Sequence, residues 1–350
     1  MRRVTVSASK TYDVLIDTGL ISRTGELIAQ NFPTCTAVII SDSNVWPLYG
    51  EIVADSMEKE GIRTIHYVFP AGEASKNTAT YFSILNFLAE NEITRSDLIV
   101  ALGGGVVGDI SGFCAATYLR GIHYVQIPTS LLAMVDSSVG GKTATDLPAG
   151  KNLVGAFKQP SIVLCDVSVL DSLPSGVFLD GCAEVIKYGV LYDADLLHTL
   201  QQTGIDFDRE SVIASCISYK ASVVAADEFD TGARQKLNFG HTIGHGIEAA
   251  SNYHISHGNA VAAGMAIITA AAVKFGFCKE HVLDALTSVL NAFSLPTTCT
   301  FTARQLYTSA LSDKKRTGGS INLILPREIG KCEICPFPVD ELETFIKAGL

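Results

Sequence analysis

The first half of the chain alternates short, β-branched apolar runs with segments of helical periodicity. The stretch TATYFSILNFLAEN, for example, has the apolar spacing of a helix. Strands that alternate with helices predict a parallel sheet covered on both faces, in which ligands bind beyond the carboxyl ends of the strands. Five runs contain the expected strands: TAVIISDSN, RTIHYVFPAGEASKN, SDLIVALGGG, IHYVQIPTS and SIVLCD.

The pattern changes near Leu173. Strand-like runs nearly vanish after this point, apart from SINLILP, and helical periodicity dominates in CAEVIKYGVL, ESVIASCISYKASVVAAD and NAVAAGMAIITAAAVKFG. A chain of 350 residues is also too long for one ordinary core. We therefore expect an α/β domain over residues 1–173 and a mostly α-helical domain over residues 174–350.

Composition argues against several classes of protein. The net charge of −10 disfavours a nucleic-acid partner, because phosphate contacts need a basic face, but it permits an anionic small substrate in a local basic pocket. The longest apolar run, residues 260–273, is too short to span a membrane and is typical of a buried helix. Nine scattered cysteines indicate reduced thiols in the cytoplasm, and Cys332 and Cys335 lack the second pair that a zinc ribbon needs.

A glycine-rich turn follows the third expected strand. Gly103, Gly105 and Gly108 form a G-x-G-x-x-G pattern, which lets the backbone approach a pyrophosphate and presents N–H groups to an anion. No acidic residue follows about 20 positions later to hold a ribose, and the candidate acid is Asp42, upstream at the end of the first expected strand. The turn therefore indicates a dinucleotide site, with a purely structural glycine turn as the alternative.

The segment MVDSSVGGKTATDLPAGKNLVGAF combines several glycines with Asp136, Lys142, Lys151 and Asn152. So many glycines disfavour a strong helix or a central strand, so we expect a long loop. Long loops inside compact domains are usually functional, and ammonium groups on one suit the capture of phosphate or carboxylate. The alternative is a solvated surface loop.

Five possible metal ligands lie in the second half: Glu184, His241, His245, His254 and His257. His241 and His245 are four residues apart, which places both rings on one face of a helix. A catalytic zinc takes three protein ligands of these kinds and leaves one position open. Spacing alone does not decide which three bind, and each histidine by itself is more often a core residue than a ligand.

Taken together, these stretches resemble the 3-dehydroquinate synthase family. The resemblance runs from about residue 40 to residue 316 in the order of the family. It implies a Rossmann-like NAD-binding domain, a helical domain, an active site between them and a homodimer. The motifs that carry it are PAGEASKN, GGGVVGD, YLRGIHYVQIPTSLLAMVDSSVGGKT, GKNLVGAF, AEVIKYG, LNFGHTIGHGIEA, HGNAVAAGM and DKKR.

The resemblance also implies roles for single residues. Zinc or cobalt would be bound by Glu184, His241 and His257, whereas His245 would contact the leaving phosphate and relay protons, and His254 would be structural. Arg120 would reach the active site of the partner subunit and bind substrate there. The positions that match NAD contacts are Asp42, Asn44, Glu73, Lys76, Gly104, Gly105, Val106, Asp109, Thr129, Ser130 and Lys151, with Asp136 and Lys142 beside them.

The substrate-binding and catalytic positions follow from the same comparison of motifs. The predicted catalytic set is His245 together with Asp136, Lys142, Lys187, Lys220, Arg234 and Asn238. Asn152 and one or both of Lys314 and Lys315 would complete the substrate contacts.

The implied reaction converts 3-deoxy-D-arabino-heptulosonate 7-phosphate (DAHP) to 3-dehydroquinate and phosphate. NAD+ transiently oxidises a secondary hydroxyl, and the resulting ketone acidifies the neighbouring C–H and permits β-elimination of phosphate. Reduction by the same nicotinamide, ring opening and an intramolecular aldol closure follow. Zinc would stabilise the alkoxide, and the lysines and Arg234 would neutralise the carboxylate and phosphate of the substrate.

The sequence departs from the family pattern at three positions. Gly176 and Val177 stand where an Arg-Glu pair is common, and Asn259 stands where glutamate is common, next to the turn of His257. Two rival enzymes share the fold: a sibling cyclase for an uncharged sugar phosphate, of the 2-deoxy-scyllo-inosose or valiolone type, and a metal-dependent polyol dehydrogenase. A non-catalytic nucleotide-binding subunit is a third rival. The retained Lys220, Arg234 and Asp313–Lys315 motif argue against the sibling cyclase. The non-catalytic subunit is disfavoured by an intact set of Glu184, His241, His257, Lys142 and Lys187.

Overall fold

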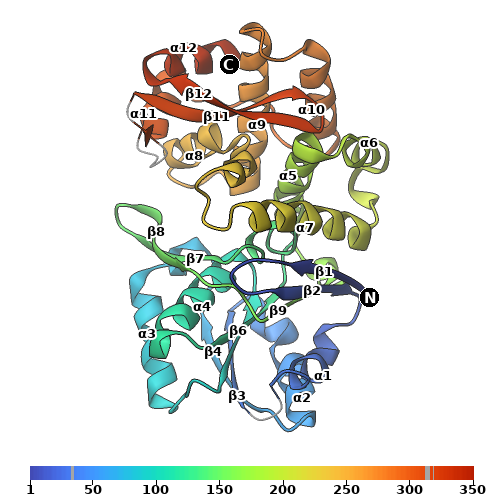
Figure 1. Cartoon of the computed structure of the whole chain (residues 1–350), viewed down its shortest axis with the longest axis vertical. Coiled ribbons are helices and arrows are strands. Elements are labelled where there is room, and N and C mark those ends of the chain that lie inside the picture. The colour runs from blue at the N-terminus through green and yellow to red at the C-terminus, as the bar shows by residue number, and fades with distance from the viewer. Residues whose placement is uncertain (33–34, 312–315, 318) are drawn as a thin grey trace. The chain divides into compact units, whose positions relative to one another are not determined.

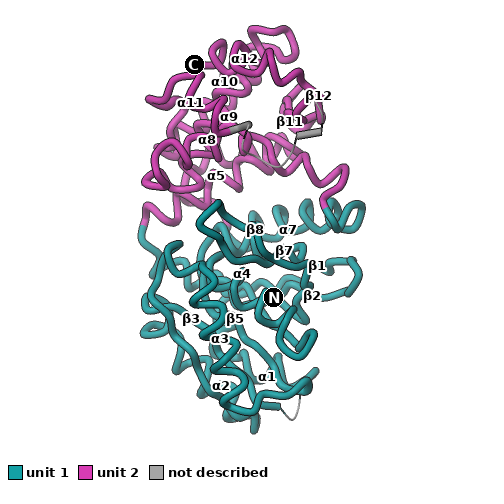
Figure 2. Tube along the Cα trace, turned by 90° about the vertical axis from the view of Figure 1, so that its left-hand side faces the viewer, with its two compact units in different colours: residues 1–174, 209–229 teal, residues 175–208, 230–350 magenta. Residues whose placement is uncertain are grey.

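The computed structural model describes residues 1–32, 35–311, 316–317 and 319–350. It divides into two compact units, coloured separately in Figure 2: unit 1 comprises residues 1–174 and 209–229, and unit 2 comprises residues 175–208 and 230–350. The expected parallel-sheet α/β domain and helical domain are confirmed. No helix in the described part of the chain has both the length and the apolar character needed to cross a membrane.

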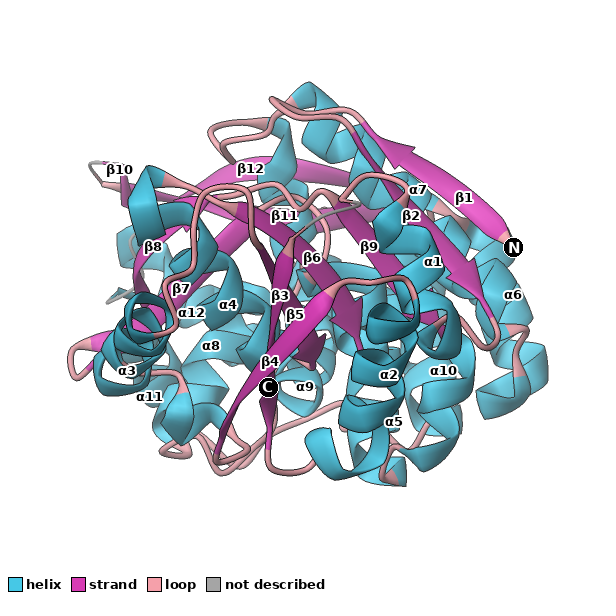
Figure 3. Cartoon of the chain, turned by 90° about the horizontal axis from the view of Figure 1, so that it is seen from below, coloured by secondary structure: helices cyan, strands magenta, loops and turns pink. Residues whose placement is uncertain are grey.

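Unit 1 is built on a seven-stranded sheet, seen in Figures 1 and 3. Its strand order is β1-β2-β9-β6-β5-β3-β4, and only β1 runs antiparallel to its neighbour. All five strands expected from the sequence are present, whereas β1 and β2 were not anticipated. The strands are β1 (Arg2–Val6), β2 (Tyr12–Asp17), β3 (Thr36–Asp42), β4 (Arg63–Phe69), β5 (Leu98–Gly103), β6 (His123–Pro128) and β9 (Ile162–Asp166).

Helices cover the sheet on both sides. Residues of α3 (Thr78–Glu90) and α4 (Gly105–Thr117) form one apolar cluster with β3, β5 and β6, while α1 (Thr24–Ala29) and α2 (Glu51–Lys59) lie on the opposite side in Figure 3. Strand β3 pairs with β4 on one side and with β5 on the other, so the winding direction of the chain reverses between β3 and β5. In doubly wound sheets the carboxyl-end crevice at this switch point is where ligands bind.

The glycine- and lysine-rich segment is not a long loop, and that expectation was wrong. It forms a β-hairpin of β7 (Lys142–Leu147) and β8 (Gly150–Phe157), preceded by the short helix η5 (Ala133–Ser137). The hairpin is a separate two-stranded sheet, so the glycines do not interrupt a central strand. Gly155 permits the close pairing of the two strands, because a Cβ atom at this position would stand 2.2 Å from the Thr143 carbonyl oxygen.

Unit 1 also includes α7 (Arg209–Ala226), which a division at residues 173 and 174 assigns to the helical domain. This helix packs against β1, β2 and η5. Helix α7 thus belongs to unit 1 because it packs on β1 and β2, although it lies in the second half of the chain. The order of the elements along the chain does not predict this packing.

The apolar helix α9 (His257–Lys274) lies at the centre of unit 2, and its buried character was expected. Helices α5, α8, α10 and α12 pack against α9, and the β-like run SINLILP is β11, paired with β12, which was not anticipated. The elements of unit 2 are α5 (Ser175–Tyr192), α6 (Ala194–Thr203), α8 (His241–Ala250), α10 (Glu280–Ala292), α11 (Ala303–Leu311), α12 (Leu342–Gly349), β10 (Arg316–Thr317), β11 (Ser320–Glu328) and β12 (Lys331–Pro338).

Helices α8 and α9 approach each other closely enough for their backbones to touch. A Cβ atom at Gly264 of α9 would lie 2.2 Å from the carbonyl oxygen of Gly240, and one at Gly244 would lie 3.1 Å from the Cα atom of Val261. Gly240, directly before α8, has a φ of 78°, which favours glycine. The glycines of LNFGHTIGHGIEA therefore serve helix packing, and this packing brings the start of α8 beside α9.

Candidate functional site

In unit 2, three helices bring one carboxylate and two imidazoles together. Glu184 of α5 is fully buried, and its Oε1 atom lies 3.6 Å from Nε2 of His241 and 3.3 Å from Nε2 of His257. His241 is the first residue of α8, and His257 is the first residue of α9. One ligand atom from each residue lies within 4.8 Å of the other two. The trio expected from the resemblance is thus assembled in space.

The donor set fits a zinc or cobalt ion. Two donors, each about 2.1 Å from zinc at a tetrahedral angle, stand about 3.4 Å apart, and both distances from Glu184 are close to this value. Two imidazole nitrogens and one carboxylate are also an ordinary ligand set for catalytic zinc. Burial lowers the pKa of His257, but Glu184 and Glu248 outweigh burial and raise the pKa to about 10, so a bound metal must displace a proton.

His245 lies beside this trio. Its ring centroid is 5.5 Å from that of His241 and 6.3 Å from that of His257, and its side chain is not buried. His245, Glu248 and His257 form a second group whose ligand atoms lie within 4.8 Å of one another. Glu248 was not singled out from the sequence, although it lies seven residues after His241, on the same face of α8.

Buried cations accompany the trio in unit 2. The Lys187 ammonium group contacts the Glu184 carboxylate one helical turn away, and its side chain is 1% exposed. Arg234 and Asn238 belong to the short helix η8 (Ala233–Asn238), and Arg234 is also buried. His254, by contrast, is exposed and bonds through Nδ1 to the Ser251 carbonyl oxygen, 2.8 Å away. Lys314 and Lys315 lie outside the described residues.

A carboxylate of α5 fixes the start of α9. Asp180 Oδ1 accepts hydrogen bonds from the backbone N–H of Asn259 at 3.0 Å, from its side-chain amide at 3.3 Å and from the Ser256 hydroxyl. The amide at position 259 thus supplies donors to Asp180, whereas a glutamate there would bring a second negative charge to it. Gly176 and Val177, the other two departures, lie in the first turn of α5, where Val177 is exposed.

In unit 1, the expected nucleotide residues collect at the switch point of the sheet. Asp42 ends β3, and its carboxylate accepts hydrogen bonds from the backbone of Asn44 at 2.8 Å and of Val45 at 3.0 Å. The glycine turn follows the neighbouring strand β5 and opens α4 at Gly105. No side-chain hydrogen bond caps this helix at Gly104, so its first N–H groups can face an anion.

Two hydroxyl groups border this helix terminus. A Cβ atom at Gly104 would lie 3.4 Å from the Ser130 hydroxyl oxygen, and one at Gly105 would lie 3.3 Å from the Ser137 hydroxyl oxygen. The backbone N–H of Thr129 donates to the Gly103 carbonyl oxygen at 3.0 Å, which holds the turn after β6 against the end of β5. Val106 lies in the first turn of α4. This arrangement has the shape of a phosphate-binding turn.

Lys76 connects the hairpin to α4. Its ammonium group contacts Asp109 of α4 and donates to Oδ1 of Asn152 at 2.6 Å. Burial lowers the pKa of Lys76, but the Asp109 carboxylate outweighs burial and leaves it above the ordinary value, so this lysine is a permanent cation. Lys151 Nζ lies 3.4 Å from Glu73 Oε1. Five of the predicted residues thus form one polar cluster.

Asp136 and Lys220 form a second polar group in unit 1. The buried Lys220 ammonium group donates to the Asp136 carbonyl oxygen at 2.6 Å and also contacts its carboxylate. Lys142 is the exposed first residue of β7. Arg120 lies in an exposed turn after α4, with a φ of 67°. α7 therefore supplies a predicted substrate residue to unit 1.

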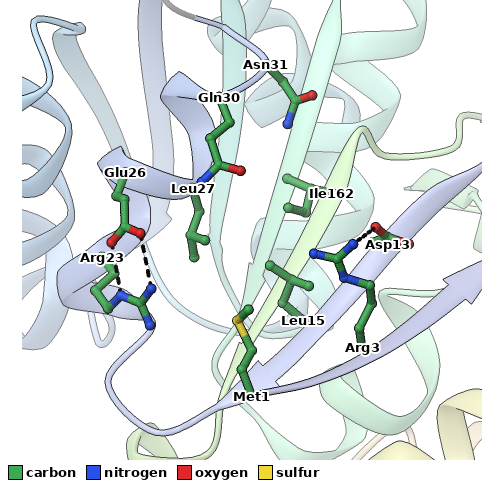
Figure 4. A pocket seen from close by; sticks show the side chains of 10 residues that line it. All are labelled: Met1, Arg3, Asp13, Leu15, Arg23, Glu26, Leu27, Gln30, Asn31 and Ile162. Carbon is green, nitrogen blue, oxygen red and sulfur yellow. Dashed lines mark hydrogen bonds and ion pairs between the residues drawn. The ribbon is translucent and has the colours of Figure 1, made fainter.

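A separate pocket of unit 1 contains none of the predicted residues (Figure 4). Its charged side chains pair with one another, Arg23 with Glu26 at 3.0 Å and Arg3 with Asp13 at 3.4 Å. It offers no converging set of charges to a ligand. The pocket is lined by Met1, Arg3, Asp13, Leu15, Arg23, Glu26, Leu27, Gln30, Asn31 and Ile162.

Comparison with known proteins identifies the relatives of this chain. Residues 66–180 match the family model described as 3-dehydroquinate synthase N-terminal, and residues 181–316 match the one described as 3-dehydroquinate synthase C-terminal. A 3-dehydroquinate synthase of Streptococcus suis is 44% identical over 355 aligned positions, which cover 99% of both chains.

Two solved structures share the fold over nearly their whole length. A 2-deoxy-scyllo-inosose synthase complexed with carbaglucose-6-phosphate, NAD+ and Co2+ superposes with a TM-score of 0.90, at 25% identity and over 100% of both chains. The 2-epi-5-epi-valiolone synthase from Streptomyces hygroscopicus, with NAD+ and Zn2+ bound, has a TM-score of 0.89, at 25% identity over 99% of both chains.

Proposed function

The chain belongs to the 3-dehydroquinate synthase family, and from that premise we propose that it converts DAHP to 3-dehydroquinate and phosphate. The observation that carries the proposal is the 44% identity to a 3-dehydroquinate synthase across 99% of the chain, against 25% to the two solved cyclases of other names. The buried cations Lys187, Lys220 and Arg234 agree with a substrate that carries both carboxylate and phosphate.

NAD and a divalent metal, zinc or cobalt, are the proposed cofactors, and they supply reversible hydride transfer and polarisation of the substrate oxygens when bound. Glu184, His241 and His257 would hold the metal. The α4 N-terminus and its glycine turn would hold the pyrophosphate, as helix N-termini commonly do. The remaining NAD contacts are the unit 1 residues Asp42, Asn44, Glu73, Lys76, Asp109, Thr129, Ser130 and Lys151, with Asp136 and Lys142 bordering them.

Other residues would bind and orient the substrate. Lys187 and Arg234 offer fixed positive charge, because each is held in place by burial. Asn238 and Asn152 offer uncharged donors, whereas Asp136 orients Lys220 through the contacts described above. His245, the accessible histidine of α8, would exchange a proton at a ring nitrogen with the departing phosphate. Lys142 would contribute a further cation.

The direct test is turnover of DAHP by the metal-loaded protein with catalytic NAD+. We expect stoichiometric phosphate release and carbocycle formation with no accumulation of NADH, because the same nicotinamide is oxidised and reduced in each cycle. Phosphate is measured colorimetrically and NADH by absorbance. Phosphate release only from a neutral sugar phosphate would favour a sibling cyclase, and NADH accumulation on glycerol-like alcohols would favour a dehydrogenase.

We also propose a homodimer in which Arg120 serves the site of the partner subunit. Arg120 lies in an exposed turn directly after α4, so its side chain is accessible to a second chain. The nine free cysteines agree with a cytoplasmic location.

Mixing two inactive variants tests the shared site. If Arg120 acts in trans, co-expressed Arg120→Ala and Lys187→Ala chains form heterodimers with one intact site, and activity should return to about a quarter of the wild-type value by random pairing. Each variant expressed alone is the control. If Arg120 acts within its own chain, every active site in the mixture lacks either the Arg120 or the Lys187 side chain. Activity then stays at the level of the single variants.

A further inference from the structure

We propose that Glu248 is a positioning residue that orients the His257 imidazole for metal binding. This inference rests on the proposed metal site, and it concerns a residue that is not itself a ligand. Glu248 is 4% exposed, and its Oε2 atom lies 3.3 Å from Nδ1 of His257. A buried carboxylate in this place must have a partner that justifies its desolvation.

The two ring nitrogens of His257 point to two different carboxylates. Nε2 lies 3.3 Å from Glu184 Oε1, on the side of the ligand trio, while Nδ1 lies 3.3 Å from Glu248 Oε2, behind it. A carboxylate that accepts the Nδ1–H proton fixes the tautomer, so the Nε2 lone pair faces the metal. It also makes Nε2 a stronger donor to the metal.

His241 has the same arrangement with a weaker acceptor. Its Nε2 atom faces Glu184, and its Nδ1 atom lies 3.1 Å from the carbonyl oxygen of Phe239. One ligand histidine is therefore oriented by a neutral carbonyl group and the other by a carboxylate. His257 is also the more exposed of the two, at 32% against 10% for the side chains. The stronger acceptor thus supports the histidine that burial restrains less.

Helix α8 is the element that connects these roles. Its first residue, His241, faces Glu184, and Glu248 lies two turns later on the same helical face. A single helix would therefore supply one ligand directly and orient a second one, on α9, through a carboxylate. Loss of the Glu248 carboxylate should weaken metal binding without removing any ligand.

A rival explanation is that His245, Glu248 and His257 themselves ligate a metal. In that case Glu248 would be a ligand, and replacing its carboxylate by an amide would change the coordination of the ion. Substitution by cobalt distinguishes the two cases, because its visible absorption bands report the ligand set directly.

The experiment compares Glu248→Gln and Glu248→Ala with wild type, using the full chain and Zn2+ in competition with a chelator. We expect Zn2+ affinity to fall roughly 10-fold to 100-fold for Glu248→Ala. Glu248→Gln should fall less, since its amide oxygen can still accept the Nδ1–H proton as the Phe239 carbonyl does for His241. The cobalt bands of Glu248→Gln should keep the wild-type positions. Glu280→Gln, at the exposed start of α10, is the matched control and should bind like wild type.

Three results would count against the proposal. Unchanged Zn2+ affinity in both variants would show that the carboxylate has no positioning role. Shifted cobalt bands in Glu248→Gln would identify Glu248 as a ligand. A Glu248→Gln loss as large as that of Glu248→Ala would contradict orientation through an acceptor. If the proposed metal site itself were wrong, wild type would bind no ion, which distinguishes that outcome from the three above. If Glu248→Ala unfolds, the nearly isosteric Glu248→Gln variant still tests the proposal.

Discussion

His257→Ala is expected to lose both the bound metal and turnover, whereas His245→Ala should keep the metal and lose turnover. His257 and His241 face Glu184 through their Nε2 atoms, at 3.3 and 3.6 Å. The side chain of His245 is exposed and therefore accessible to a substrate. Removing one of three ligands should abolish high-affinity binding, because a catalytic zinc site normally uses three protein ligands.

Metal content after dialysis and the rate of phosphate release from DAHP give the two readouts. His254→Ala is the control, since this exposed histidine bonds to the neighbouring Ser251 carbonyl oxygen, and both readouts should stay at the wild-type level. Equal metal loss in His245→Ala and His257→Ala would overturn the division of roles and favour the trio of His245, Glu248 and His257.

Gly264→Ala is expected to separate α8 from α9, lower the stability of unit 2 and weaken metal binding. The added Cβ atom would stand 2.2 Å from the Gly240 carbonyl oxygen and 2.8 Å from the Gly244 nitrogen, both of them backbone atoms. Backbone atoms cannot rotate away, so the helices must move. Such overpacking typically costs about 1–3 kcal/mol of unfolding free energy. His241 follows Gly240 directly, so this movement displaces a proposed ligand.

Denaturant unfolding and chelator competition measure the two effects. Gly176→Ala is the matched control: it lies in α5, and a Cβ atom there would meet no atom within 4 Å. Its stability should be unchanged or slightly raised, because alanine favours the helix over glycine. Wild-type stability and metal affinity in Gly264→Ala would mean that the α8–α9 contact does not position the ligands.

The strand and helix pattern of the first half was sufficient to predict the parallel sheet. The run TAVIISD is β3 and LIVALG is β5, and each has a buried, apolar centre because both faces of the sheet are covered. Strands β1 and β2 were not expected from the sequence, and both carry charged residues, among them Arg2 and Asp13. The hairpin of β7 and β8 was wrongly predicted to be a loop. Its glycines suggested a flexible segment, whereas in the structure they allow the two strands to pair closely.

The metal ligands show a similar limit. Spacing alone made His241 and His245 equivalent, since residues four apart share a face of any helix. Their different surroundings depend on Glu184 and on the start of α9, which approach α8 only in the folded chain. The roles of Glu248 and Asp180 were not predicted, because the sequence does not show which residue a helical carboxylate will contact in the folded chain.

The sequence by itself determined the alternation of elements, the change of pattern near Leu173 and the family, because periodicity and motif order are local properties of the chain. Only the tertiary structure decided that α7 returns to unit 1, that Asp180 caps α9 and that Glu248 stands behind His257. Each of these is a contact between residues distant in sequence or on different helices. The geometry of such contacts depends on helix packing, and at Gly240, Gly244 and Gly264 that packing is set by the absence of side chains.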